Sequence, residues 1–170
     1  MRFLFALILA AAVAGCGFQL RGAASAQLPY KTMFIALPET ADVNVWLQRH
    51  IKATGSTEIV DEPKAAEAVF QQLGDQRQKS ILSINSLGRV REYRLTLTYT
   101  FRVITPEGKV LVPPNEITLV RDVTHDDSKV LAKDIEENLL WRDMHTDLVG
   151  QIMRRLSVVK PLDPNREDAD

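Results

Sequence analysis

The residues that most often carry catalysis or bind metals are few and scattered in this chain. The three histidines, His50, His125 and His145, form no His-Glu-x-x-His pair, and the chain has one cysteine, so no set of residues has zinc-site spacing. Adjacent Asp126 and Asp127 suit a helix start, where carboxylates meet the positive end of the helix dipole. Neither a phosphate-binding glycine loop nor a Gly-x-Ser-x-Gly elbow occurs. The sequence therefore predicts no enzyme and no metal site. A hydrolase would need histidines and carboxylates to converge in a cleft.

Basic side chains cluster on both sides of a predicted hairpin turn at residues 85–88. Phosphate groups are natural ligands for such a cluster, although a solvated strand edge is the alternative interpretation. Lys133 is a further candidate, because a cation in the first turns of a helix opposes the dipole unless a carboxylate such as Asp134 compensates it. The residues of the cluster are Arg77, Lys79, Arg89 and Arg91.

Residues 93–103 alternate between apolar and polar side chains, which predicts a long strand with one buried face. Its other face is flat, able to form hydrogen bonds and positively charged at both ends. Such a face is able to pack against a polar partner, and a solvated sheet face is the alternative. The residues of this polar face are Arg94, Thr96, Thr98, Thr100 and Arg102.

The N-terminus has the pattern of a secretory signal. Met1-Arg2 is followed by an apolar run that ends at Gly15, which is too short to span a bilayer. Small residues lead directly into Cys16, and this resembles the lipobox of bacterial lipoprotein precursors. We expect cleavage before Cys16 and a lipid anchor on it, with an N-acyl group and an S-diacylglycerol, and no other cofactor. Gly17, rather than Asp, follows the cysteine, which favours the outer membrane over the inner.

Length and composition predict one domain. A signal peptide at residues 1–15 and a lipidated tether at 16–28 leave residues 29–157 as the folded domain, and residues 158–170 are predicted to be a disordered acidic tail. The net charge of −1 predicts no attraction to nucleic acid.

The order of predicted elements indicates an α+β fold. Residues 31–37 read as a buried strand, 43–54 as an amphipathic helix that Gly55 ends, and 57–60 as a short strand. Period-two strands follow to residue 124, with Pro113 and Pro114 at an edge, bulge or loop. A helix over 128–156 has an apolar stripe of Leu131, Ile135, Leu139, Leu148, Ile152 and Leu156. We expect a two-layer sandwich, with both helices on one face of a mixed, mainly antiparallel sheet of four to five strands.

Three segments resemble the LptE family of lipopolysaccharide-assembly lipoproteins. The first is Cys16-Gly17-Phe18-Gln19-Leu20-Arg21-Gly22, with an aromatic residue and then Leu-Arg after the Cys-Gly pair. Arg91-Glu92-Tyr93 opens the long strand, and Val130-Leu131-Ala132-Lys133-Asp134 opens the final helix, with Glu136 and Glu137 following. The resemblance extends over essentially the whole folded chain in the same order.

The resemblance implies a non-enzymatic lipoprotein that plugs the LptD β-barrel, supports its assembly and binds lipopolysaccharide. It implies a lipopolysaccharide contact at Lys133. A second basic residue of the family falls on Ser86 here, which leaves Arg89 and Arg91 as the candidates to replace it. The polar face of residues 94–102 becomes the candidate barrel contact. The alternative is a lipid-carrying outer-membrane lipoprotein with its own acyl-chain cavity, in which residues 93–103 would not pack fully against Leu139 and Ile152.

Overall fold

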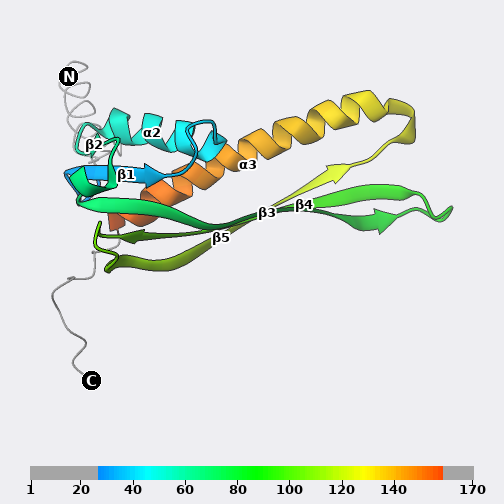
Figure 1. The fold of residues 1–170 in the computed structure, drawn as a ribbon. Coiled ribbons are helices and arrows are strands. Elements are labelled where there is room, and N and C mark those ends of the chain that lie inside the picture. Colours follow the sequence, from blue (N-terminus) through cyan, green and yellow to red (C-terminus); the bar gives the residue numbers. More distant parts are fainter. Residues whose placement is uncertain (1–26, 159–170) are drawn as a thin grey trace, which may run out of the picture.

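Five strands form one mixed sheet in the computed structural model, which describes residues 27–158 (Figure 1). The order across the sheet is β2-β1-β3-β4-β5. β1 runs parallel to both β2 and β3, whereas β3, β4 and β5 pair antiparallel. The strands are β1 (Thr32–Ala36), β2 (Glu58–Ile59), β3 (Ala68–Ile84), β4 (Val90–Ile104) and β5 (Val110–Thr124).

Two helices cover one face of this sheet: α2 (Asp42–Thr54) and α3 (Val130–Val158) (Figure 1). The predicted α+β two-layer architecture is thus confirmed, with five strands. Short 3-10 turns at Pro63–Ala65 and Asp127–Lys129 precede β3 and α3. Among residues 27–158, neither helix combines the length and apolarity needed to cross a bilayer.

Local signals explain where these elements stop. Gly55 ends α2 in the left-handed conformation at φ 65°, and its N–H donates to the Lys52 carbonyl. Gly88 closes the β3–β4 turn at φ 76°, a value that glycine adopts without steric cost. Pro113 and Pro114 lie in β5, at the outer edge of the sheet, where a missing backbone donor is tolerated. The register with β4 also shifts there, between Phe101 and Val103, so of the predicted edge, bulge or loop the structure has the first two.

The core lies between the sheet and the helices at one end of an elongated molecule. The apolar face of β4 is fully buried there, in one cluster that contains residues of α2 and of the C-terminal half of α3. Leu28 also belongs to this cluster, and α3 continues to Val158, so the folded body extends beyond both ends of the predicted 29–157. The signal peptide, Cys16 and the tail from residue 159 lie outside the described residues. The buried β4 residues are Leu95, Leu97, Tyr99, Phe101 and Val103.

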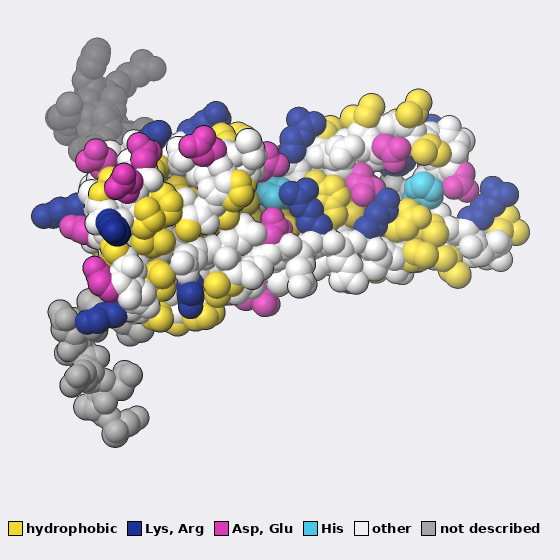
Figure 2. All heavy atoms as spheres, viewed as in Figure 1, with side chains coloured by type: hydrophobic (Ala, Val, Ile, Leu, Met, Phe, Trp, Pro, Cys, Tyr) yellow, Lys and Arg dark blue, Asp and Glu magenta, His cyan; other side chains and the backbone are white. Residues whose placement is uncertain are grey.

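The predicted apolar stripe of the last helix was wrong in its N-terminal half. Leu131, Ile135 and Leu139 are 81%, 62% and 48% exposed, whereas Leu148 is fully buried. Leu139 and Leu148 are nine residues apart, which is two and a half turns at 3.6 residues per turn, so they point to opposite sides of the helix. The side that faces the sheet instead continues through Leu140 and Trp141. Apolar side chains are consequently exposed on the outer surface of α3 (Figure 2).

Only part of the sheet reaches the far end of the molecule. β1 and β2 flank only the beginning of β3, and the long strands β3, β4 and β5 continue with the N-terminal half of α3 above them (Figure 1). The β3–β4 turn and the connection from β5 to α3 form this far end, which we call the tip.

Candidate functional site

The tip brings together basic residues that lie far apart in the sequence. Arg89 and Arg91 come from the β3–β4 hairpin and Lys133 from the second turn of α3, and all three line one open cleft of about 700 Å³. The antiparallel register explains the meeting, because Glu92 of β4 pairs with Thr124, the last residue of β5. The hairpin and the start of α3 therefore lie at the same end of the sheet. We call this hollow the tip cleft.

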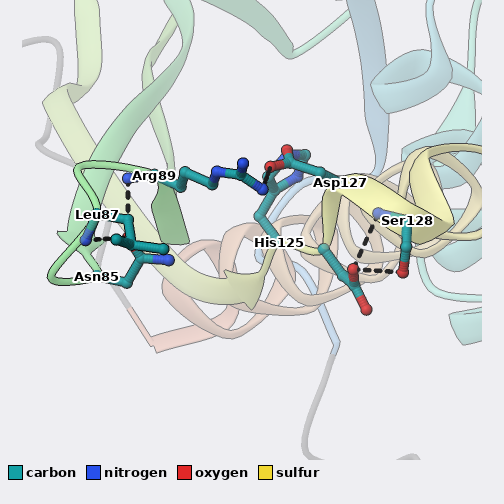
Figure 3. A network of polar contacts seen from close by, with 7 residues as sticks. Asn85, Leu87, Arg89, His125, Asp127 and Ser128 are labelled. Atoms are coloured by element: carbon teal, nitrogen blue, oxygen red, sulfur yellow. Dashed lines mark hydrogen bonds and ion pairs between the residues drawn. The ribbon is translucent and has the colours of Figure 1, made fainter.

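The hairpin that carries Arg89 is rigidly closed. The Asn85 side-chain oxygen accepts hydrogen bonds from the backbone N–H groups of Leu87 and Arg89, each at 2.9 Å (Figure 3). The Gly88 N–H donates to the Asn85 carbonyl at 3.0 Å. An Asn side chain that holds its own turn in this way is a recurrent turn motif. It fixes the direction in which the Arg89 side chain leaves the hairpin.

Arg89 reaches across the cleft toward the start of α3. Its guanidinium Nη1 lies 3.9 Å from Asp127 Oδ2, and the same carboxylate lies 3.1 Å from His125 Nε2 (Figure 3). The His125 ring meets Tyr93 edge-on, with 5.3 Å between ring centroids. Since both Arg89 and Asp127 are well exposed, this ion pair is weak. Arg91 lines the same cleft and forms no ion pair within residues 27–158.

Lys133 is held more firmly. Its Nζ donates to Thr124 Oγ1 and to Glu136 Oε2, each at 2.7 Å. The compensating carboxylate is thus Glu136, one turn further along the helix, and not Asp134 as predicted. Three residues separate Lys133 from Glu136, a spacing that places side chains on the same helix face. The ammonium group is therefore positioned before any ligand arrives.

The adjacent aspartates lie where the chain enters α3, as the sequence indicated, with Asp126 capping the 3-10 turn that precedes the helix. Asp126 Oδ1 accepts hydrogen bonds from the Ser128 backbone N–H at 3.0 Å and from the Ser128 hydroxyl at 2.7 Å. These bonds hold the pKa of the Asp126 carboxyl below its usual range. Asp126 and Asp127 nevertheless both line the tip cleft, where they oppose the binding of an anion. Lys129 also lines it; this cation adjoins the predicted helix start but was not among the predicted site residues.

The predicted polar face of β4 is the outer face of the sheet, on the side away from the helices. Each of its two arginines is engaged by a neighbouring strand, Arg94 by a carboxylate and Arg102 by a neutral amide that leaves its charge uncompensated. Arg94 forms a two-pronged pair with Asp122 of β5, at 2.8 and 3.0 Å, which lowers the pKa of the Asp122 carboxyl and raises that of the Arg94 guanidinium. Arg102 Nε donates to the Gln71 side-chain oxygen at 2.9 Å.

Register extends this face across three strands. Thr96, Thr98 and Thr100 of β4 lie between a row of small and amide side chains on β3 and a second row on β5. We call the whole surface the Thr-Gln face; it is broad, mostly uncharged and rich in hydrogen-bonding groups. The glutamines were not among the predicted contact residues, although their alternation with basic residues in 76–80 is the pattern of one strand face. The added residues are Gly74, Gln76, Gln78 and Ser80 on β3 and Glu116, Thr118 and Val120 on β5.

The space between sheet and helices is packed with side chains. The apolar residues of β4 meet Met144, Leu148 and Ile152 of α3, all with no exposed surface. Leu139, named as a packing partner from sequence, points away. A carrier of acyl chains would need room at this position, so the packing favours a plug over the lipid-carrier alternative.

Histidines and carboxylates do not gather into a cleft as a hydrolase would require. His125 lies at the tip, whereas His145 is a buried residue of α3. Within the described part of the chain, no group of three His, Cys, Asp or Glu side chains is placed to hold a metal ion.

A protein-family model matches most of the chain. Residues 30–156 fit the model named LptE and described as Lipopolysaccharide-assembly. Two curated relatives bear the name LPS-assembly lipoprotein LptE. That of Pectobacterium atrosepticum is 28% identical over 163 residues, covering 92% of this chain and 86% of the relative. That of Yersinia enterocolitica is 29% identical over 150 residues, covering 86% of this chain and 70% of the relative.

Solved structures of bacterial lipoproteins have the same fold. An uncharacterized lipoprotein B from Nitrosomonas europaea superimposes with a TM-score of 0.71 and 34% identity, covering 83% of this chain and 90% of that one. A minor lipoprotein from Acinetobacter baumannii gives a TM-score of 0.66 and 26% identity, covering 81% and 99%.

Proposed function

This chain belongs to the LptE family, and from that premise we propose that it is a lipid-anchored outer-membrane lipoprotein that acts in lipopolysaccharide assembly without catalysis. It occupies the lumen of an LptD-like β-barrel and binds lipopolysaccharide at the tip cleft. The family is one of envelope lipoproteins of lipopolysaccharide assembly. The barrel partner, the outer-membrane position and the binding residues are our proposal.

The observation that carries the lipopolysaccharide contact is the convergence of Lys133, Arg89 and Arg91 on one cleft. Lipopolysaccharide carries phosphate groups on an acylated sugar, and phosphate oxygens accept strong charge-assisted hydrogen bonds from such cations. Lys133 is already oriented by Thr124 and Glu136, so little side-chain entropy is lost when it binds.

The shape of the molecule supports a plug anchored at one end. β1, which follows the tether, begins at the end opposite the tip (Figure 1). β4 has 15 residues and so extends about 50 Å at about 3.3 Å per residue. That length exceeds the hydrocarbon core of a bilayer, about 30 Å. With Cys16 held in the inner leaflet, the tip is able to reach the level of the outer leaflet, where lipopolysaccharide is inserted.

The Thr-Gln face supports contact with a barrel wall. The lumen of a membrane β-barrel is polar, and a plug inside it must offer hydrogen-bonding groups without a large unpaired charge. Arg94 is paired with Asp122, and Arg102 and Glu116 contribute one charge of each sign, so the Thr-Gln face has no net charge.

Purification of the lipidated protein from outer membranes tests this function. We expect a large β-barrel protein in equal amount and bound lipopolysaccharide. Cys16→Ala should release the free protein into the periplasmic fraction, because the lipid provides the anchor. Recovery without a barrel would overturn the plug, and a Cys16→Ala protein that still sediments with membranes in the absence of the barrel would overturn the anchor.

A further inference from the structure

Most of one edge of β3 is open. β1 pairs with β3 only from Ala68 to Gln71, because the chain leaves β1 at Ala36 and turns into α2. Beyond Gln71, β3 continues to Ile84 with β4 on one side, and within residues 27–158 no strand pairs with its other side. The open part of the edge therefore lies on the same side of β3 as β1, beyond the point where β1 ends.

The central part of this edge is regular. Register breaks occur near Leu73 and Leu82, and between them β3 pairs with β4 without interruption from Gly74 to Ile81. These residues span about 26 Å at about 3.3 Å each. An open strand edge offers unpaired backbone N–H and C=O groups to another chain, and natural proteins usually cover or disrupt it. Here the residues from Asp75 to Leu82 are all exposed.

A cleft of about 470 Å³ lies beside this edge, between β3 and α3. Arg77 enters it from β3, because it pairs with Leu97 and so shares the helix-facing side of the sheet. Ile135, Trp141, Arg142 and His145 enter it from α3. Figure 2 shows histidine and basic side chains in the hollow between α3 and the strands. We call this hollow the edge cleft.

Several groups in the edge cleft have no partner within the described residues. His145 is 4% exposed, and neither of its ring nitrogens has a hydrogen-bond partner there. Buried polar groups are rarely left unpaired in native proteins. Arg77 and Arg142 form no ion pair within residues 27–158, and the Arg77 guanidinium lies 5.9 Å from the centre of the Trp141 ring. Asp42 is the one carboxylate of the described chain that lines the cleft, so the edge cleft favours an anion.

We propose that an extended segment of the barrel partner joins the sheet along β3 between Gly74 and Ile81, and that an acidic side chain of this segment enters the edge cleft. Its carboxylate pairs with Arg77 and Arg142 and accepts a hydrogen bond from the His145 ring. Backbone pairing of this kind provides affinity, and pockets for alternate side chains provide specificity. Apolar side chains of the segment meet Ile135. The inference rests on the proposed function, because it names the barrel as the source of the segment.

Charge argues against a second copy of this chain as the occupant. Two copies paired through this edge would add a second Arg77 beside Arg77 and Arg142, with Asp75 as the one carboxylate among residues 74–81 to offset it, since Lys79 is already paired with Glu137 at 2.6 Å. Like charges on paired strands are destabilising. An acidic extended segment has no such conflict.

Hydrogen exchange on the intact lipidated complex tests backbone pairing directly. Amides between Gly74 and Ile81 that face the open edge should exchange at least about tenfold more slowly in the complex than in the free chain. Arg77→Glu and Arg142→Glu should each remove most of this protection. Arg154→Glu is the matched control, since it makes the same charge change at an exposed position of α3 outside the edge cleft. We expect that variant to retain full protection.

A photo-crosslinker at Asn138, which lines the edge cleft and lies outside the Thr-Gln face, identifies the occupant. We expect a crosslinked barrel peptide that contains Asp or Glu. Unchanged exchange in an intact complex, or a crosslink only to residues 159–170 or to a second copy, would overturn the inference while leaving the proposed function in place. Failure to recover any barrel would instead overturn the proposed function and the inference with it.

Discussion

The Lys133 ammonium group donates a 2.7 Å hydrogen bond to the hydroxyl of Thr124, the last residue of β5. This bond ties the beginning of α3 to the end of the sheet and points the cation into the tip cleft. Thr124 thereby becomes a positioning residue for Lys133, a role that its place in the sequence does not suggest.

Lys133→Asp should weaken binding of purified lipopolysaccharide at least about tenfold, because a charge-assisted hydrogen bond is lost and a repulsive charge is added. The fold should persist, since the position is on the surface. Binding measured by titration on the soluble Cys16→Ala form checks this expectation. Lys109→Asp, in the β4–β5 turn, is the control and should bind as before. Equal affinity of the two variants would exclude Lys133 from the site.

Asp127→Asn should strengthen lipopolysaccharide binding, by about twofold to fivefold. The Asp127 carboxylate lies 3.9 Å from the Arg89 guanidinium and lines the tip cleft, so its removal frees Arg89 and takes away a charge that repels phosphate. Asp61→Asn, in the connection after β2, controls for net charge. Weaker binding by the Asp127 variant alone would mean that the carboxylate holds Arg89 in place for the ligand.

Thr98→Glu should reduce copurification of the barrel several-fold without altering stability. Thr98 is in the middle of the Thr-Gln face, opposite Thr118 and Gln76, and a buried unpaired charge at an interface is costly. Ala53→Glu introduces the same charge on the exposed surface of α2 and should leave the complex intact. Normal recovery of the barrel with Thr98→Glu would place this face in solvent.

Stability should fall as the pH drops below about 6.5, because burial, and secondarily Arg77, lowers the pKa of the His145 imidazole, while Asp75 and Asp42 oppose this shift. Between that lowered pKa and the ordinary value near 6.5, the unfolded chain binds more protons than the folded one, so acid favours unfolding. Urea unfolding at pH 5.5 and pH 7.5 measures the difference. His145→Gln should reduce the pH dependence of the unfolding free energy in this window, and His125→Gln should preserve it. An unchanged pH dependence in the His145 variant would mean that another group causes it.

Leu148→Ala should lower the free energy of unfolding by about 2–5 kcal/mol, the usual cost of emptying a buried leucine site. Leu139→Ala should change it by less than about 1 kcal/mol, because Leu139 is 48% exposed. Denaturant unfolding of both variants tests which side of α3 faces the sheet. Equal costs would mean that the two leucines share one face after all.

The sequence alone was sufficient where the signal is local. The strict alternation of residues 93–103 determined a half-buried strand and its inner and outer faces, because successive strand side chains point to opposite sides. Asn85, Gly88 and Gly55 marked turns and a helix end for reasons of backbone conformation. The family resemblance agreed with the family match of residues 30–156, which contains two of its three segments, residues 91–93 and 130–134.

Relationships across the chain were decided by tertiary structure. The antiparallel register of β4 and β5 placed Lys133 beside Arg89 and Arg91 and paired Arg94 with Asp122. The side of α3 that faces the sheet was predicted wrongly in its N-terminal half. Leu139 and Leu148 were assigned to one stripe although their spacing of two and a half turns puts them on opposite sides of the helix. The open edge of β3 exists because β1 stops at Ala36 while β3 continues to Ile84. Sequence patterns report the environment of one element at a time, whereas clefts and edges depend on where neighbouring elements end.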